Sequence, residues 1–440
     1  MSSFDGRVSE YPWIAIDCFL KQNFTAHFYF LSHLHQDHMK GLDSPAFRTH
    51  LNGRPKSRIY CSEITKSILI KDANYSHLKL FLQSVPTNDK IFIELQQTFD
   101  TSYTEIETVA VTFLPSGHCP GSMMFLLEGK HGNILYTGDF RMEGDEHKFM
   151  VYNYLSAITI DSVYLDTTFC LPEMMTIPKR KTITKQIINK IQQWLCQGTN
   201  HVVCLRCRAR LGYEYLLSEI AKKLKTKILV HSDQIKLYDN IPEVRSNLTL
   251  VDKETKIHMC IRGRCRLLSG PPTPDSKKLK ILRIKPCALS FAYNMEALKQ
   301  GCFTRGANFY SFLYSAHSSM AEIIEFLKCL RPLKVYPNVV PVKDSDLDAV
   351  TQRINGIMGN CDIPRKKTKM TASCSNPGKD QGKEILPLEP IANTDLDYKA
   401  SRKKSAIMQL NDKNLMLDDV DPCQRFICRR RSRDIQNNSS

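Results

Sequence analysis

Residues His33–His38, with the sequence HLHQDH, place three histidines and one aspartate in six consecutive positions directly after an apolar run. So many ligand-type side chains in one turn would repel one another and leave buried polar groups without partners unless a cation binds them. If the strand direction persists, His33 and His35 project to the same side, which suits two imidazoles on one ion. Asp37 and His38 follow one turn later and can face a second position. The segment therefore predicts a metal centre.

Two further segments supply ligand types of the same kind at positions where an α/β scaffold exposes them. The loop Gly117–Ser122, GHCPGS, places His118 after the strand-like run Val109–Leu114. The segment Thr137–Phe140, TGDF, places Asp139 directly after another strand-like run. Loops that follow strands commonly carry functional residues. A loop histidine or a turn aspartate is ordinary by itself, but together with the histidine-rich turn the set predicts one site.

The order of apolar patterns predicts a mixed α/β protein. Many short strand-like runs fill the first 165 residues, and a different texture begins near residue 176. There the periodicity predicts a helix over Thr182–Gly198, a strand over His201–Leu205, a helix over Tyr213–Leu224 and a strand over Lys227–Val230. This βαβ rhythm is typical of an inserted parallel α/β unit. A last helix is predicted over Met320–Leu330, with Ser319 and Glu322 in a capping-box pattern.

Charge and composition narrow the class of partner. The 61 Lys and Arg outnumber the 45 Asp and Glu, for a net charge of +16, which favours a polyanion such as nucleic acid. Residues 361–440 lose the apolar periodicity and carry basic clusters, so they are expected to be a disordered basic tail. No apolar run is long enough to span a bilayer, and no secretory signal pattern opens the chain. The 16 cysteines are therefore expected to be thiols or metal ligands.

The motifs in their order resemble a known family. HLHQDH, then GH, then GD resembles the metallo-β-lactamase fold. IAIDCF, VYLDTTFC, SAHSS, GYEYL and YPNVVPV extend the similarity over roughly residues 1–350 to the β-CASP nucleases, and among these to the DNA-repair members. The resemblance implies an αββα sandwich with an inserted β-CASP α/β domain. The expected division is 1–156 and 316–360 for the metallo-β-lactamase domain, 157–315 for the β-CASP domain and 361–440 for the tail.

The resemblance also implies roles for individual residues. His33, His35 and His118 would hold one metal, Asp37 and His38 would favour a second, and Asp139 would lie between them. The implied catalytic residues are Asp17, Asp37, Asp139, Asp166 and His317, with Asp17 and Asp37 as orienters or proton acceptors and Asp166 fixing His317 through a hydrogen bond. RNA-cleaving members carry a histidine near the position of Val339, so the valine favours DNA.

Three weaker sites are also expected. His231, His258, Cys260 and Cys265 have the residue types of a closed structural zinc site, although loop thiols and unrelated histidines would give the same pattern. Ser318 and Ser319 precede the last predicted helix, whose N-terminus offers N–H groups to a phosphate. Candidate contacts to a nucleic-acid backbone, each of which is equally well an ordinary surface charge, are Lys40, Arg141, Arg206, Arg208 and Arg210.

These features predict a metal-dependent DNA nuclease that hydrolyses phosphodiester bonds by a metal-activated water, with zinc at the active site and magnesium or manganese as a second or working ion. By resemblance it would be a 5′ exonuclease on single strands and an endonuclease on hairpins and overhangs, in non-homologous end joining. It would be a nuclear monomer whose partners are DNA ends, the DNA-dependent protein kinase and end-joining factors. The single Ser/Thr-Gln pair, Thr351-Gln352, argues against kinase control. The alternatives are an RNA-processing β-CASP nuclease, a small-molecule hydrolase, or a non-catalytic scaffold that binds DNA ends.

Overall fold

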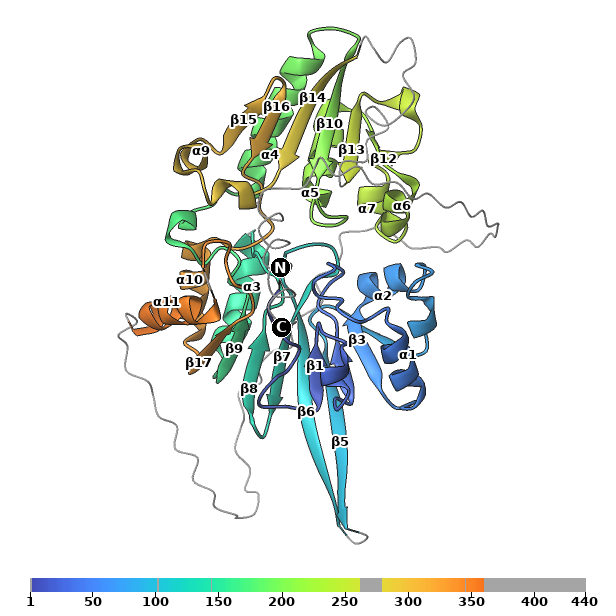
Figure 1. Cartoon of the computed structure of the whole chain (residues 1–440), viewed down its shortest axis with the longest axis vertical. Helices are drawn as coiled ribbons and strands as arrows, with labels where there is room; N and C mark the ends of the chain where they lie inside the picture. The colour runs from blue at the N-terminus through green and yellow to red at the C-terminus, as the bar shows by residue number, and fades with distance from the viewer. Residues whose placement is uncertain (1, 101–102, 144, 262–278, 345, 360–440) are drawn as a thin grey trace, which may run out of the picture. The chain divides into compact units, whose positions relative to one another are not determined.

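The computed structural model of the chain describes residues 2–100, 103–143, 145–261, 279–344 and 346–359 (Figure 1). The described residues contain three β-sheets with helices against them, so the predicted mixed α/β class is confirmed. The predicted tail, 361–440, lies outside the described residues.

The first sheet is parallel, with its four strands in chain order. They are β1 (Ile14–Ile16), β2 (Phe28–Phe30), β3 (Arg58–Ser62) and β4 (Leu82–Val85). The helices α1 (Pro45–Asn52) and α2 (Glu63–Leu69) cover one face of it, where Phe47 and Leu69 join a buried cluster with Tyr29 and Ile59.

The second sheet has six strands in the order β17-β9-β8-β7-β6-β5. Their bounds are β5 (Lys90–Asp100), β6 (Tyr103–Pro115), β7 (Met123–Gly129), β8 (Gly132–Tyr136), β9 (Ser162–Leu165) and β17 (Lys334–Pro337). Apolar side chains of this sheet, such as Val111 and Phe125, share a core with Ile14 and Phe30 of the first sheet, so the two sheets pack face to face. The ends of β5 and β6 project as a long two-stranded ribbon (Figure 1).

Three helices accompany the six-stranded sheet: α3 (Asp145–Ser156), α10 (Met320–Leu330) and α11 (Leu347–Gly359). Helix α10 begins where it is predicted to begin, because the side chain of Ser319 accepts from the N–H of Glu322 while the Glu322 carboxylate accepts from the N–H of Ser319. This capping box also fixes the loop that carries His317, immediately before the helix.

The third sheet has seven strands in the order β12-β11-β13-β10-β14-β16-β15. Their bounds are β10 (His201–Cys207), β11 (Ile228–Leu229), β12 (Leu248–Thr249), β13 (Ile257–Ile261), β14 (Lys280–Pro286), β15 (Cys302–Gly306) and β16 (Phe309–Phe312). Among the described residues, the helices of this part are α4 (Arg180–Leu195), α5 (Glu214–Leu224), α6 (Ser232–Ile235), α7 (Pro242–Arg245) and α9 (Met295–Gln300). The chain leaves the six-stranded sheet after β9 and rejoins it through α10 and β17, so this seven-stranded lobe is interposed in the sequence.

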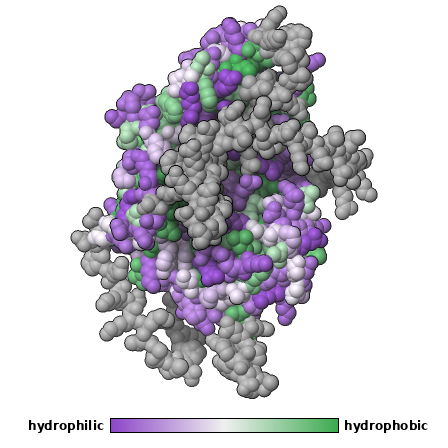
Figure 2. Space-filling view, viewed as in Figure 1, coloured by the Kyte–Doolittle hydropathy of each residue, from purple (hydrophilic) through white to green (hydrophobic). Residues whose placement is uncertain are grey.

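The surface of the described part is mixed in polarity. Hydrophilic residues cover most of the coloured area in Figure 2, with hydrophobic residues in small patches between them. Within the described ranges, none of the helices combines the length and the apolar character that crossing a membrane requires.

Candidate metal centre

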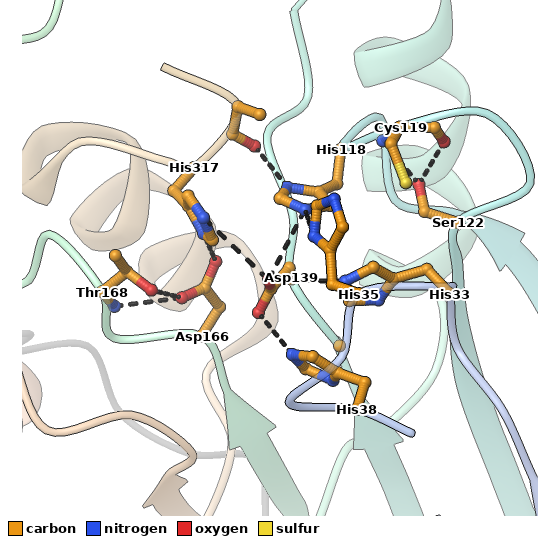
Figure 3. A network of polar contacts seen from close by, with 12 residues as sticks. His33, His35, His38, His118, Cys119, Ser122, Asp139, Asp166, Thr168 and His317 are labelled. Carbon is orange, nitrogen blue, oxygen red and sulfur yellow. Dashed lines mark hydrogen bonds and ion pairs between the residues drawn. The ribbon is translucent and has the colours of Figure 1, made fainter. Parts of the chain in front are cut away.

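The predicted ligands lie in loops that follow strands, and those loops meet at one edge of the paired sheets (Figure 3). His33–His38 follows β2, His118 follows β6, Asp139 follows β8 and Asp166 follows β9. His317 joins them from the loop before α10. Ligand atoms within 4.8 Å of one another form three groups among the described residues: His33, His35, His118 and Asp139; Asp17, His33 and His38; and Asp139, Asp166 and His317.

The carboxylate of Asp139 lies at the centre of this arrangement (Figure 3). Its Oδ2 is 3.5 Å from Nε2 of both His33 and His118, and 3.9 Å from Nε2 of His317. Its Oδ1 is 3.2 Å from Nε2 of His38. One carboxylate thus faces imidazoles on two sides, the arrangement expected of a residue between two metal positions.

Each of the five imidazoles uses one ring nitrogen in a hydrogen bond and turns the other toward the centre. The partners are Ser32 Oγ for His33 Nδ1 at 2.9 Å, Leu211 O for His35 Nε2 at 3.3 Å, Asp17 Oδ2 for His38 Nδ1 at 2.8 Å, Ala316 O for His118 Nδ1 at 2.9 Å and Asp166 Oδ2 for His317 Nδ1 at 2.9 Å. Metal-ligating histidines are held in this way, because the partner fixes the tautomer and the ring orientation.

The inward-facing nitrogens fit a metal ion. Nε2 of His33 and Nε2 of His38 are buried, and they face the Asp139 carboxylate at 3.5 and 3.2 Å without a well-formed hydrogen bond. Nδ1 of His35 lies 3.0 Å from Nε2 of His118, so two imidazoles converge on one point. Imidazole nitrogens with a carboxylate oxygen are the donors that zinc takes in proteins. The residues present therefore fit the metal that the sequence predicts.

Burial sets the charge of these groups. It lowers the pKa of His35, with help from His33, to about 3, and it lowers the pKa of His118 well below the ordinary value. Both rings are then neutral, as metal binding requires. Burial alone would raise the pKa of Asp139, but His38 and His317 beside it lower that pKa well below the ordinary value. The site therefore presents neutral imidazoles at His35 and His118 beside the ionised carboxylate of Asp139.

Asp17 holds one of the candidate ligands, His38, through a hydrogen bond. Its side chain is 3 % exposed and accepts hydrogen bonds from Ser32 N–H at 2.7 Å, Tyr136 Oη at 2.8 Å and His38. Its backbone adopts a left-handed φ of 55°, a conformation that costs energy for a residue other than glycine. Since its oxygens are engaged with these groups, Asp17 is placed to orient His38.

Asp37 lies beside the three groups and belongs to none of them. It lines a cavity of about 270 Å³ that opens on the centre, together with His317 and Val339. Its Oδ2 accepts the N–H of Ser2 at 2.9 Å. The predicted metal-binding role of Asp37 stays a prediction.

The hydrogen bond expected between Asp166 and His317 is present, and it has a measurable consequence. Burial by itself would lower the pKa of His317. The carboxylates of Asp166 and Asp139 outweigh burial and raise that pKa above its ordinary value, to about 8. Asp166→Asn removes one of these charges, so we expect the pKa of His317 in the metal-free chain to fall by about 1 unit or more. At least about half of the rings would then be neutral at pH 7, whereas most are protonated in the wild type. An NMR titration of the chelated chain measures this, and the exposed Asp89→Asn should leave the curve unchanged.

The structure corrects the prediction that Arg141 contacts nucleic acid. Its side chain is fully buried. The guanidinium donates to the carbonyl oxygens of Ser315 and Ile177, and it pairs with Glu143 at 2.8 Å. Arg141 therefore joins segments of the fold. Lys40, from the same set, donates to Ser2 O at 2.7 Å.

The predicted phosphate contacts at Ser318 and Ser319 are also unsupported by the geometry. Both residues are 2 % exposed. The N–H and the Oγ of Ser318 donate to Phe140 O, and the N–H of Ser319 donates to Glu322. These donors are therefore already engaged within the fold.

The predicted structural zinc site cannot be assembled from the described residues. Cys265 lies outside them. His258 and Cys260 are on β13, where Cys260 Sγ lies 3.2 Å from Sγ of Cys204, and His231 precedes α6. This site stays a prediction.

Of the groups that hold the ligands in place, sequence reasoning predicted Asp166 and gave Asp17 an orienting role, but it missed Ser32, Leu211 and Ala316. The carbonyl oxygens of Leu211 and Ala316 belong to apolar residues, and their side chains carry no sign of this role. Ser32 is adjacent to His33, so of the three missed partners its hydroxyl is the one that a sequence argument could have found.

Two family models match the chain. The model described as DNA repair metallo-beta-lactamase matches residues 242–343, and the model described as anti-Pycsar protein Apyc1 matches residues 20–185.

Curated relatives match a longer stretch. Protein artemis of Gallus gallus is 39% identical over 357 residues, covering 79% of this chain and 49% of the relative. Protein artemis of Homo sapiens is 38% identical over 352 residues, covering 78% and 50%. The 5′ exonuclease Apollo of Rattus norvegicus is 30% identical over 327 residues, covering 74% and 53%. The chain thus spans about half the length of these relatives.

Proposed function

This chain belongs with the Artemis-like DNA repair metallo-β-lactamase proteins, and on that premise we propose that it is a metal-dependent nuclease acting on DNA. The observation that carries the proposal is the convergence of five imidazoles on Asp139, each with its outer nitrogen secured, at a cavity lined by His35, Asp37, His118 and His317. A scaffold without catalysis has no need of such an arrangement.

His33, His35, His118 and Asp139 would hold one ion, and His38 with Asp139 would favour a second. A divalent ion bound there would supply Lewis acidity, which polarises a phosphoryl oxygen and lowers the pKa of bound water to about 7. We propose zinc for the first position and magnesium or manganese as a second or working ion.

The protein's own residues would act on the phosphate. His317 lines the cavity, and with its pKa near 8 in the metal-free chain it carries a proton at neutral pH. It is therefore placed to meet negative charge on the phosphate oxygens. Asp166 orients this ring through Nδ1, while Asp17 orients His38 from the opposite side of the site.

DNA is the proposed substrate for two reasons. Val339 is apolar and lies in the cavity wall, and the RNA-cleaving β-CASP proteins that this chain resembles carry a histidine near this position. The relatives are named for Artemis and for the 5′ exonuclease Apollo. We therefore propose 5′ exonuclease action on single strands and endonuclease action on hairpins and overhangs. We also propose a nuclear role in non-homologous end joining. The seven-stranded lobe is proposed to be the β-CASP domain.

A direct assay tests the proposal. The full chain is incubated with 5′-phosphorylated single-stranded DNA, hairpin DNA and matched RNA, with added zinc, magnesium or manganese. We expect DNA to be cut in preference to RNA, and we expect both a chelator and His33→Ala to abolish cutting. His131→Ala, a partly exposed histidine away from the site, is the matched control. Preferential cutting of RNA would move the chain to the RNA-processing class, and tight DNA binding without any metal-dependent cutting would favour the scaffold.

A further inference from the structure

One turn of the seven-stranded lobe reaches a ligand of the candidate metal centre. The turn 208–213 connects β10 to α5, and its Leu211 carbonyl oxygen lies 3.3 Å from Nε2 of His35. His35 itself follows β2 of the four-stranded sheet, so this contact joins segments 176 positions apart in the sequence. A backbone carbonyl can only accept, so the contact requires a proton on Nε2 of His35.

A buried polar network holds this turn from behind. The carboxylate of Glu214, 8 % exposed, accepts the Gly212 N–H on both of its oxygens, at 3.0 and 2.9 Å. The hydroxyl of Tyr238, a fully buried residue, is 2.8 Å from Glu214 Oε1 and 3.1 Å from Arg210 O. The side-chain amide of Gln234 donates to Arg210 O and, at 2.9 Å, to the Tyr238 hydroxyl. Two of the turn's backbone groups are thus anchored on either side of Leu211.

The backbone of the turn depends on this anchoring. Gly212 has a φ of +104°, a conformation that residues with a side chain rarely adopt. With such a flexible residue beside Leu211, the direction of the Leu211 carbonyl is set by what holds its neighbours.

We propose that Glu214 and Tyr238 are positioning residues for the metal centre, because they fix the turn that carries the Leu211 carbonyl. That carbonyl holds His35 in the tautomer in which Nδ1 is unprotonated, and this Nδ1 lies 3.0 Å from His118 Nε2. The inference rests on the proposed metal centre. It adds that the seven-stranded lobe must hold one of the metal ligands, His35, in place. The same turn lines the cavity through Arg208, Leu211 and Gly212, so one anchor sets both the ligand and the cavity wall.

Two measurements on the full chain test this proposal. The first is the rate at which the zinc-loaded chain releases zinc to a chromophoric chelator. The second is the protonation of the His35 nitrogens, read from long-range ¹H–¹⁵N NMR correlations. The variants are Tyr238→Phe, Glu214→Gln and Glu214→Ala, with Glu219→Gln on the same helix as the matched control. Thermal melting of each variant establishes that it is folded.

We expect Tyr238→Phe and Glu214→Ala to release zinc about tenfold faster, the low end for partners that orient metal ligands. Glu214→Gln keeps one acceptor for the Gly212 N–H and should fall between these variants and the wild type. In the variants that release zinc faster, His35 should show mixed tautomers. If Glu214→Ala does not fold, Tyr238→Phe and Glu214→Gln decide the question.

Folded variants that release zinc at the wild-type rate with Nε2 of His35 protonated would overturn the inference and leave the proposed function standing. A wild-type chain that binds no zinc, magnesium or manganese would instead overturn the proposed function, and this inference with it.

Discussion

Asp139→Asn is expected to abolish cleavage, with a loss of at least about 10³-fold in rate, the upper range for removing one group that stabilises charge at a reacting centre. The substitution keeps the shape of the side chain and removes its charge. Both oxygens of Asp139 face imidazole nitrogens, so no single neighbour can replace it. The asparagine amide could also turn an N–H group toward the protonated His38 Nε2, which needs an acceptor.

Metal binding should fail together with catalysis. In the wild type, the charge of Asp139 is what offsets burial at His38, whose pKa is raised well above its ordinary value. Without that charge, His33, His35 and His118 have no carboxylate in their group to complement a divalent ion. Zinc content of the purified chain and cleavage of single-stranded DNA measure the two effects, with the exposed Asp89→Asn as the control. An Asp139→Asn protein that keeps its zinc and cuts at the wild-type rate would contradict the assignment.

The centre was accessible to prediction because its ligands are concentrated in short segments. His33, His35 and His38 share one turn, while His118 and Asp139 each follow a strand whose apolar pattern can be read from the sequence. The start of α10 was equally predictable, since a capping box is a contact between residues three positions apart. Where residue type and local spacing determine the chemistry, the structure agrees with the prediction.

The remaining features depend on contacts between distant segments. Arg141 looks like a surface charge in the sequence, but carbonyl oxygens from Ile177 and Ser315 surround it in the fold. Leu211 has an apolar side chain, and its function lies in a carbonyl whose direction is set by Glu214 and Tyr238. Neither position carries a local pattern, because the partners meet only after the sheets have packed.

Arg141→Met is expected to lower the free energy of unfolding by about 3–5 kcal/mol, the range for removing one partner of a buried ion pair. The guanidinium is fully buried, pairs with Glu143 at 2.8 Å and lies 3.4 Å from Glu322. It also donates to Ser315 O at 3.1 Å and Ile177 O at 3.0 Å. Methionine fills a similar volume but leaves these carboxylates and carbonyls without their donor.

The same substitution should reach the metal centre. Ser315 O, which Arg141 holds, is next to Ala316, whose carbonyl oxygen is the partner of His118 Nδ1 at 2.9 Å. Urea unfolding of the chelated chain measures the stability, and zinc release measures the effect on the centre. Lys148→Met is the matched control, because Lys148 pairs with Glu325 at the surface and such pairs contribute at most about 1 kcal/mol. If the free energy of unfolding of Arg141→Met lies within about 1 kcal/mol of the wild-type value, the loss expected for a broken buried ion pair is absent. Arg141 would then not join these segments as described.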